Sequence, residues 1–248
     1  MSSSSIFSGF HHSFGAFDLI LIHARHNYLK GPVRCLVRSV QMPVKNSCPY
    51  ETTGPSVVLH EGKWLRLQSV GFRKPGGPQG QVWESVHRVT KASANGVDGV
   101  DIIPILFKDG KKFFVLVKQY RIPLSGFSLE FPAGLVDRNE SVEGAGLREL
   151  KEETGYTANK VISVSKGKQM LDPGLSDDSV AIITVEIDGD ELINQNPEQH
   201  LDEGESIEVV LVECSKIMEY LKSIEESTFI ESMVYTFAVG YTMSHGHC

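Results

Sequence analysis

One predicted helix, over residues 141–153, limits the possible folds of this chain more than any other feature. Ser141 can cap its N-terminus, and Gly155 stands where a left-handed residue commonly ends a helix. Between them runs an apolar stripe that other elements must cover. Its members are Val142, Ala145, Leu147 and Leu150. The sequence therefore predicts a helix that packs on a hydrophobic core.

Three carboxylates share one face of the same helix. Glu149, Glu152 and Glu153 stand at positions i, i+3 and i+4, with Arg148 beside them. Like charges this close destabilise a helix by about 0.2–0.5 kcal/mol per pair unless a cation lies between them. Mg²⁺ and Mn²⁺ bind carboxylate oxygens and share their remaining positions with phosphates. The pattern indicates either a site for such a cation or a solvated charged face.

The segment from Gly134 to Tyr156 resembles the signature of the Nudix hydrolases, G-x5-E-x7-R-E-U-x-E-E-x-G-U, where U is a bulky apolar residue. The fixed positions are matched by Gly134, Glu140, Arg148, Glu149, Leu150, Glu152, Glu153 and Gly155, with Tyr156 as a variant of the last site. The resemblance implies an α+β Nudix fold, with mixed β-sheet layers sandwiched between helices. It also implies that water cleaves a nucleoside diphosphate linked to another moiety.

The family resemblance assigns roles inside this segment. The helix glutamates Glu149, Glu152 and Glu153 would bind Mg²⁺, with Mn²⁺ as the other candidate, and the carbonyl of Ala133 would complete the metal shell. Arg148 would orient a carboxylate through its guanidinium fork.

Strand-like runs surround the helix. Residues 64–72 and 81–89 flank a turn-rich segment and predict an antiparallel hairpin. Further runs at 100–106, 112–120, 180–187 and 207–212 predict strands, and a C-terminal helix is expected from about Ser215. Strands and helices in this order favour a layered arrangement over a regular βαβ repeat. We expect an extension at 1–56, a hairpin module for dimerisation and substrate binding at 57–98, and the Nudix domain at 99–248.

The flanking sequence is similar to the ADP-ribose or ADP-sugar pyrophosphatase subgroup of this family. Pro173 follows Tyr156 after sixteen intervening residues, which is the spacing of that subgroup's marker. The similarity extends through Glu61-Gly62-Lys63-Trp64, Trp83-Glu84-Ser85-Val86, the stretch at 117–121 and Leu129-Glu130-Phe131-Pro132-Ala133-Gly134.

Trp64 and Trp83 are the two tryptophans of the chain, and both lie in the predicted hairpin module. Two indoles can sandwich an adenine by stacking, although ordinary packing is the alternative. In the similar enzymes the module is exchanged between subunits and the two tryptophans come from different chains. The resemblance therefore implies a homodimer with composite sites.

Other residues are candidates for substrate contacts. Arg88 and Arg121 suit phosphate oxygens, or are surface cations in salt bridges. Glu84 could bind an adenine amino group or a ribose, and Asp172 could contact the terminal ribose or simply form a turn. Glu130 could bind substrate or assist the metal. Leu135 completes the predicted substrate-binding set.

The attacking water needs a base. Glu205 lies in an acidic loop, Asp202-Glu203-Gly204-Glu205, and corresponds to the loop glutamate proposed as base in the similar enzymes. An exposed acidic loop without a catalytic role is the alternative interpretation. Glu153, or a hydroxide on the metal alone, are the other candidates for the base.

The expected reaction is Mg²⁺-dependent hydrolysis of ADP-ribose and related ADP-sugars to AMP and a sugar phosphate. Oxidised nucleoside diphosphates or UDP-glucose are alternative substrates, and an ADP-ribose-binding module without turnover is an alternative of another class. Residues 1–60 carry five Lys/Arg and two acidic residues, whereas the remainder carries 19 and 29. Because the body is acidic, we expect no nucleic-acid partner.

The cysteines and the N-terminus bear on the compartment. Cys35, Cys48, Cys214 and Cys248 are widely spaced, which favours reduced thiols and argues against a zinc site. The apolar run at 17–22 is too short to span a membrane, so neither a transmembrane helix nor a membrane partner is expected. The family type implies a cytoplasmic or nuclear protein. The Ser-rich basic extension at 1–55 is also compatible with a mitochondrial transit peptide, or with an unstructured tail.

Overall fold

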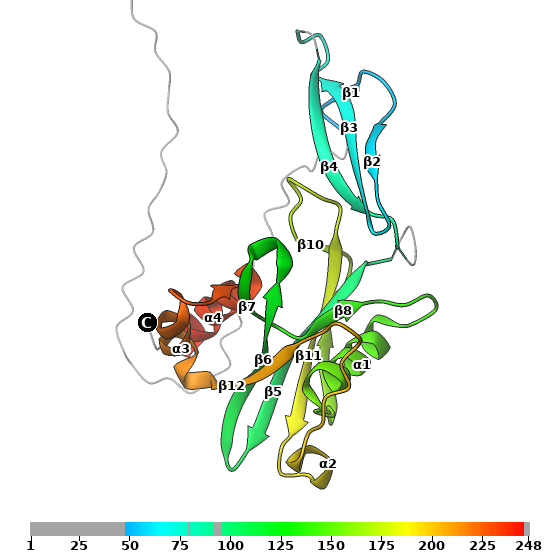
Figure 1. Cartoon of the computed structure of the whole chain (residues 1–248). Helices are drawn as coiled ribbons and strands as arrows, with labels where there is room; N and C mark the ends of the chain where they lie inside the picture. Colours follow the sequence, from blue (N-terminus) through cyan, green and yellow to red (C-terminus); the bar gives the residue numbers. More distant parts are fainter. Residues whose placement is uncertain (1–47, 79, 92–95, 246–248) are drawn as a thin grey trace, which may run out of the picture. The chain divides into compact units, whose positions relative to one another are not determined.

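The computed structural model describes residues 48–78, 80–91 and 96–245 (Figure 1). Most of the expected extension at 1–56, with its targeting hypothesis, lies outside these residues, as do Cys35 and Cys248. Cys48 and Cys214 are free thiols. Among the helices of the described part, none has the length and apolar character needed to cross a bilayer.

The first sheet is the N-terminal module. It contains β1 (Glu51–Thr52), β2 (Val57–Glu61), β3 (Leu65–Arg73) and β4 (Gln81–Arg88), and β3 pairs antiparallel with the other three. The predicted hairpin is confirmed as β3 and β4. Strand β1 lies within the stretch 1–56 that the sequence assigned to the extension. It belongs to the module instead, because its backbone pairs with the end of β3. None of the residues in these four strands is buried.

The second sheet has nine strands: β5 (Gly99–Lys108), β6 (Lys111–Arg121), β7 (Gly126–Glu130), β8 (Ala133–Leu135), β9 (Lys160–Val164), β10 (Gln169–Met170), β11 (Ser179–Asp188), β12 (Ile207–Glu213) and β13 (Phe229–Ile230). It is mixed, since β11 runs parallel to β5 and β13 parallel to β7, whereas the remaining pairs are antiparallel. Asp109 and Gly110 adopt positive φ in the β5–β6 turn, as their sequence suggests.

Helices cover both faces of this sheet (Figure 1). They are α1 (Val142–Thr154), the short α2 (Leu192–Gln195), α3 (Ile217–Ile224) and α4 (Ser232–Ser244). Alternation along β6 divides the core, because Val115 packs in the cluster with α1 while Phe114 and Leu116 pack with α3 and α4. The expected α+β fold, with sheet layers between helices, is confirmed.

The prediction of one C-terminal helix from Ser215 is wrong in one respect, because two helices occupy this region. The amides of Ser227 and Thr228 both donate to the carbonyl of Ile224 and end α3. Phe229 and Ile230 then pair with β7 before α4 begins. Aromatic and β-branched residues suit an extended segment, and the pairing with β7 outweighs helix continuation.

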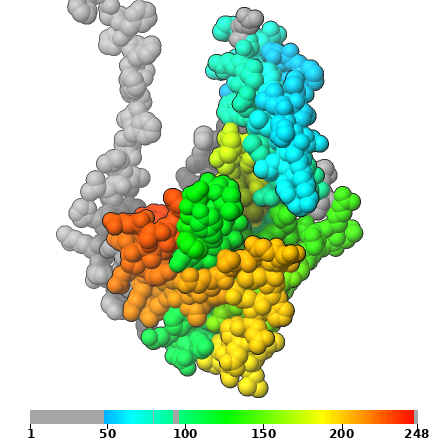
Figure 2. All heavy atoms as spheres, in the orientation of Figure 1, coloured from blue at the N-terminus to red at the C-terminus, as the bar shows by residue number. Residues whose placement is uncertain are grey.

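Large apolar side chains remain exposed at the turn between β6 and β7, which is green in Figure 2. They are Tyr120, Ile122, Leu124 and Phe127. The rings of Tyr120 and Phe127 meet edge to face, with their centroids 5.5 Å apart.

Candidate functional site

Helix α1 has the caps that the sequence predicts. The Ser141 hydroxyl accepts a hydrogen bond from the Gly144 amide at 3.0 Å, and Gly155 ends the helix at φ +74°. Ala145 and Leu150 are fully buried in the core. Their burial turns the edge that carries Arg148 and Glu149 away from the core and toward the loop before the helix.

Arg148 connects the carboxylates of the site. Its guanidinium donates to Glu140 through two nitrogens, each at 3.0 Å, and to Glu149 and Glu152 at 2.8 and 3.0 Å. A further hydrogen bond of 3.1 Å reaches the carbonyl of Leu135. These contacts raise the pKa of Arg148 and, in return, lower the pKa of Glu140. The predicted role of Arg148 in orienting carboxylates agrees with this geometry.

Glu153 is the most enclosed of the three helix glutamates, with 4% of its surface exposed. Burial raises its pKa to about 8, although the Ala133 amide donates to its carboxylate at 3.0 Å. Burial also raises the pKa of Glu149. The charges of Glu149 and Glu205 add to the raised pKa of Glu153, and those of Glu152 and Glu205 to that of Glu149. The helix edge therefore gathers carboxyl groups whose ionised form is disfavoured and would be stabilised by a cation.

The loop between α2 and β12 brings Glu205 close to this edge. The His200 amide donates to the carbonyl of Glu152 at 2.8 Å, and the side chain of Gln199 donates to the carbonyl of Glu153. Glu205 itself accepts from the Asp202 amide at 3.0 Å, and its charge raises the pKa of Glu153. Glu205 is exposed, and this position is compatible with its predicted role as base. That role stays a prediction.

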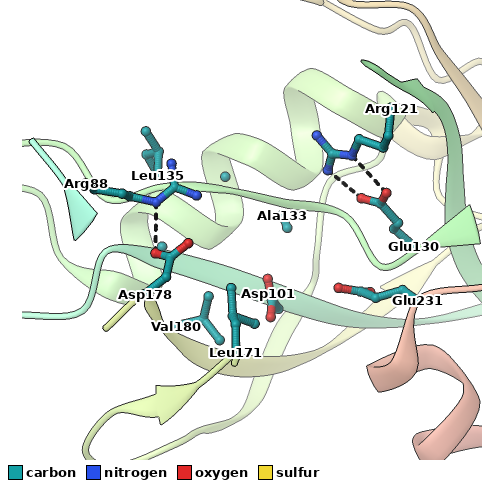
Figure 3. Close-up of a pocket in the computed structure, with 12 residues that line it drawn as sticks. Arg88, Asp101, Arg121, Glu130, Ala133, Leu135, Leu171, Asp178, Val180 and Glu231 are labelled. Carbon is teal, nitrogen blue, oxygen red and sulfur yellow. Dashed lines mark hydrogen bonds and ion pairs between the residues drawn. The ribbon is translucent and has the colours of Figure 1, made fainter. Parts of the chain in front are cut away.

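Residues of β5, β6, β8 and β11 line a cleft of about 280 Å³ that adjoins the helix edge (Figure 3). The Arg88 Nε atom donates to Asp178 at 2.8 Å, and Arg121 holds Glu130 with two hydrogen bonds. These pairings raise the pKa of both arginines. Ala133, Gly134 and Leu135 form part of the wall. The structure thus brings together five of the predicted site residues: Arg88, Arg121, Glu130, Ala133 and Leu135.

Three acidic residues of this cleft were not among the predicted site residues: Asp101, Asp178 and Glu231. Burial raises the pKa of Asp101 to about 6 and that of Glu231 to about 7, and neighbouring carboxylates add to both shifts. A sequence signal for Asp101 existed, because it interrupts the apolar run from Val100 to Leu106. Asp178 and Glu231 carried no such signal.

The two tryptophans lie outside the cleft. Trp64 is 59% exposed, with the Lys63 ammonium 4.4 Å from its ring centroid, and Trp83 is 49% exposed. Trp83 pairs with Val70, whereas Trp64 directly precedes Leu65, so they are separated by about 20 Å along β3. Within one chain the two indoles therefore do not face each other across one adenine. Glu84 is likewise exposed on β4.

Asp172 forms a turn, which is the second of the two roles that its sequence context allows. Its carboxylate accepts from the Gly174 amide at 3.2 Å, and its carbonyl accepts from the amides of Leu175 and Ser176. The turn stands beside the cleft, where Leu171 contributes to the lining. A contact between Asp172 and a substrate stays a prediction.

The same turn is attached to the N-terminal module. The Val86 amide donates to the Leu175 carbonyl at 3.0 Å, and the His87 ring lies 2.9 Å from Asp177. Together with the ion pair between Arg88 and Asp178, these contacts connect β4 to one wall of the cleft. The module therefore takes part in shaping the site.

The carboxylates are not gathered around one point. In residues 48–78, 80–91 and 96–245, no group of three or more acidic, histidine or cysteine side chains is placed to hold a metal ion together. Glu149 and Glu152 are turned toward Arg148, and Glu153 toward the Ala133 amide. The assignment of Glu149, Glu152 and Glu153 as metal ligands stays a prediction.

Comparison with known sequences identifies relatives across most of the chain. The NUDIX domain family matches residues 97–231. The chain is 49% identical to putative nudix hydrolase 2 of Caenorhabditis elegans, over 78% of this chain and 86% of that protein. It is 38% identical to the ADP-ribose pyrophosphatase of Saccharomyces cerevisiae, over 73% and 78% of the two chains. Identity to the ADP-sugar pyrophosphatase of Mus musculus is 32%, over 77% and 86%.

Among solved structures, a crystal structure of an ADP compounds hydrolase resembles this chain with a TM-score of 0.59. The alignment covers 82% of this chain and 100% of the other, at 20% sequence identity. At this identity the likeness shows the fold alone.

Proposed function

The chain belongs to the Nudix hydrolase family, and on this premise we propose that it hydrolyses the pyrophosphate bond of ADP-ribose and related ADP-sugars. Water would attack a phosphorus atom of the bridge, which gives AMP and ribose 5-phosphate, or the matching sugar phosphate. Two of its relatives are named for these activities, as ADP-ribose pyrophosphatase and ADP-sugar pyrophosphatase.

One observation carries this proposal. Glu140, Glu149 and Glu152 are arranged around Arg148, and Glu153 accepts from the Ala133 amide at the wall of the cleft, with every fixed position of the signature present. A protein that only bound the nucleotide would not need the complete glutamate set. The geometry therefore favours turnover over a binding module without catalysis.

Enzymes of this family generally use a divalent metal. The donor chemistry of this site fits one, although the three helix glutamates do not converge on one point among the described residues. The donors are carboxylate oxygens, which are the ligands that Mg²⁺ prefers. Burial and the charges of neighbouring carboxylates raise the pKa of Glu149 and Glu153, so a cation would relieve an existing cost. We assign Glu149, Glu152 and Glu153 as the residues that hold Mg²⁺, with Mn²⁺ as the other candidate and the Ala133 carbonyl as a further ligand.

A divalent metal, when bound, supplies positive charge that stabilises the phosphoryl oxygens as the pyrophosphate bond breaks. The protein's own contribution is positioning. Arg148 fixes the orientation of Glu149 and Glu152 through its hydrogen bonds. We assign Glu205 as the base that accepts the proton of the attacking water. Its neighbour Glu153, whose pKa of about 8 lies near neutrality, is the alternative base.

Arg88 and Arg121 are assigned to substrate recognition. Both line the cleft, and a guanidinium fork matches phosphate oxygens. In the present structure each is paired with a carboxylate, Asp178 or Glu130. Substrate phosphates would therefore compete with these carboxylates for the arginines.

The N-terminal module supports a homodimer in which modules are exchanged. Its strands contain no buried residue, and Val57, Val58, Leu65 and Val82 are each at least half exposed. A sheet without a core gains stability by packing on a second surface. The exposed turn between β6 and β7 offers such a surface. In an exchanged dimer, Trp64 of one chain and Trp83 of its partner would stack on the two faces of one adenine, with Glu84 at its edge.

Product analysis tests the proposed reaction. Purified protein is incubated with ADP-ribose at several Mg²⁺ concentrations, and the nucleotides are separated by chromatography. We expect AMP and ribose 5-phosphate in equal amounts, with none in excess EDTA. Faster turnover of UDP-glucose or of an oxidised nucleoside diphosphate would replace the proposed substrate class, and binding of ADP-ribose without AMP release would contradict the proposed enzyme.

We also propose a cytoplasmic and nuclear location, with mitochondrial import as the alternative if residues 1–55 act as a transit peptide. The family type supports the first, and the basic, Ser-rich composition supports the second. Imaging of fluorescent fusions with and without residues 1–55 separates them, because only a transit peptide would move the signal to mitochondria.

A further inference from the structure

The cleft contains a buried carboxylate that the proposed mechanism does not use. Asp101 lies on β5 and lines the cleft, yet only 5% of its surface is exposed. Its Oδ2 atom has no hydrogen-bond partner among the described residues. Figure 3 shows it between Asp178 and Glu231. A buried polar atom without a protein partner costs stability, and a bound water or a ligand is the usual way to offset that cost.

The neighbouring acids differ from Asp101 in their partners. Asp178 is paired with Arg88, and Glu130 with Arg121, so their charges are offset within the protein. Asp101 forms no ion pair in the portion of the chain that the structure covers. The Asp101 carboxylate thus keeps acceptor capacity that no described residue uses, whereas one oxygen of Asp178 and both oxygens of Glu130 already accept from an arginine.

The charge balance of the cleft indicates what kind of ligand group this position takes. The lining contains two arginines against four carboxylates: Asp101, Glu130, Asp178 and Glu231. A phosphate placed beside Asp101 would meet a like charge at low dielectric, which is strongly unfavourable. A hydroxyl or amino group can instead donate a hydrogen bond to the carboxylate. The local charge therefore favours a neutral hydrogen-bond donor over a phosphate.

We propose that Asp101 is a specificity-determining residue, which accepts a hydrogen bond from a hydroxyl or amino group of the nucleotide sugar. The inference rests on the proposed function, since it assigns a role within the same cleft. The donor belongs either to the adenosine part or to the second sugar. A site built around a buried acceptor discriminates strongly against analogues that lack the matching donor, because the acceptor is then left without a partner.

Two substitutions separate this role from simple repulsion. Asp101→Asn and Asp101→Leu both remove the negative charge, but the amide keeps one neutral acceptor and leucine keeps none. If Asp101 binds a donor, KM for ADP-ribose rises in the order wild type, Asn, Leu, by about ten-fold or more for Leu. If the carboxylate only repels phosphate, both variants lower KM to a similar extent. Thermal melting of each variant verifies that it is folded.

Product inhibition locates the donor. For Asp101→Leu, a weaker inhibition constant for AMP alone places the donor on the adenosine part, and a weaker constant for ribose 5-phosphate alone places it on the second sugar. Unchanged constants for both, or a lowered KM, would overturn the inference. Asp190→Asn is the matched control. Asp190 lies in the loop after β11, where it accepts from the Asp109 amide of the β5–β6 turn, and it is not among the residues that line the cleft.

The proposed function and this inference fail in different ways. Wild-type protein that releases no AMP from ADP-ribose contradicts the reaction, but not the role of Asp101. In that event, calorimetric titration of ADP-ribose into wild type and into Asp101→Leu still tests the role of Asp101. Equal affinity of the two proteins would then refute the role of Asp101.

Discussion

The carboxylate of Glu149 lies against the α-carbon of Gly134, in the space that a side chain at position 134 would occupy. A β-carbon built on Gly134 would collide with all three atoms of the Glu149 carboxyl group. Gly134 is in β8, where its backbone pairs with Val100, so the strand holds it in place. The glycine of the signature is thus required here by a close side-chain approach, and not by a left-handed backbone.

Gly134→Ala should therefore disable the site while the fold survives. The new methyl group displaces the Glu149 carboxylate, and misplacement of a catalytic group by about 1 Å can lower turnover on the order of 100-fold. We expect kcat for ADP-ribose to fall by at least about ten-fold with a nearly unchanged circular dichroism spectrum. Gly240→Ala is the control, since nothing lies within 4 Å of a β-carbon there. Full activity of Gly134→Ala would argue against a catalytic role of Glu149.

Glu153→Gln should abolish turnover with little effect on folding. The glutamine side chain can still accept a hydrogen bond from the Ala133 amide, so the local packing is kept. It is a much poorer Mg²⁺ ligand than a carboxylate and no base, so we expect kcat to fall by about 100-fold or more. Steady-state kinetics over a Mg²⁺ titration measures this. Activity close to wild type would remove Glu153 from the site assignment.

Trp64→Ala and Trp83→Ala should complement each other in a mixed dimer. Each variant alone loses one stacking partner, which weakens nucleotide binding by about 1–3 kcal/mol and raises KM accordingly. If the modules are exchanged, a dimer of one Trp64→Ala chain and one Trp83→Ala chain contains one intact site. Mixing the two variants under conditions that permit subunit exchange should then restore part of the wild-type activity. Size-exclusion chromatography with light scattering confirms the dimer, and a monomer would contradict the exchange.

The free energy of unfolding of the wild-type protein should fall as the pH rises from about 5 to 7 in metal-free buffer. Burial raises the pKa of Glu231 from 4.5 to about 7, so the folded protein keeps a proton that the unfolded chain has already lost. This cost to the stability of the fold is absent below pH 4.5 and is on the order of 3 kcal/mol above pH 7. Glu231→Gln should therefore have a higher unfolding free energy than wild type at pH 8, and a similar one at pH 4.

Urea denaturation at several pH values measures this difference. Glu226→Gln is the control, because Glu226 is an exposed residue in the turn after α3. The prediction is wrong if Glu231→Gln and wild type follow the same curve between pH 4 and pH 8. A wild-type stability that increases from pH 5 to 7 would also contradict it.

The features predicted correctly from the sequence are mostly local ones. The caps of α1, the glutamate edge with Arg148, and the turn at Asp109 and Gly110 depend on residues within a few positions of one another. Helical spacing and capping hydrogen bonds determine these features before the chain folds further. The strands β5, β6, β11 and β12 were predictable for a similar reason, because each is an apolar run bounded by turn residues.

The second C-terminal helix and the strand before it were not predictable in this way. Residues 215–226 are rich in helix formers, and the short stretch from Ser227 to Ile230, which is not, gives no local signal strong enough to place a strand between two helices. The break occurs because Phe229 and Ile230 pair with β7, about a hundred residues earlier in the chain. No local pattern contains that partner.

What the sequence determined by itself is the helix edge that carries Glu149, Glu152 and Glu153, since its geometry follows from backbone periodicity alone. What only the tertiary structure decided is the cleft beside it. Asp101 and Asp178 meet there because β5 and β11 run parallel, and Glu231 joins them because β13 pairs with β7. Such contacts depend on which distant strands bury the most apolar surface together, and this depends on the whole chain and not on any one segment.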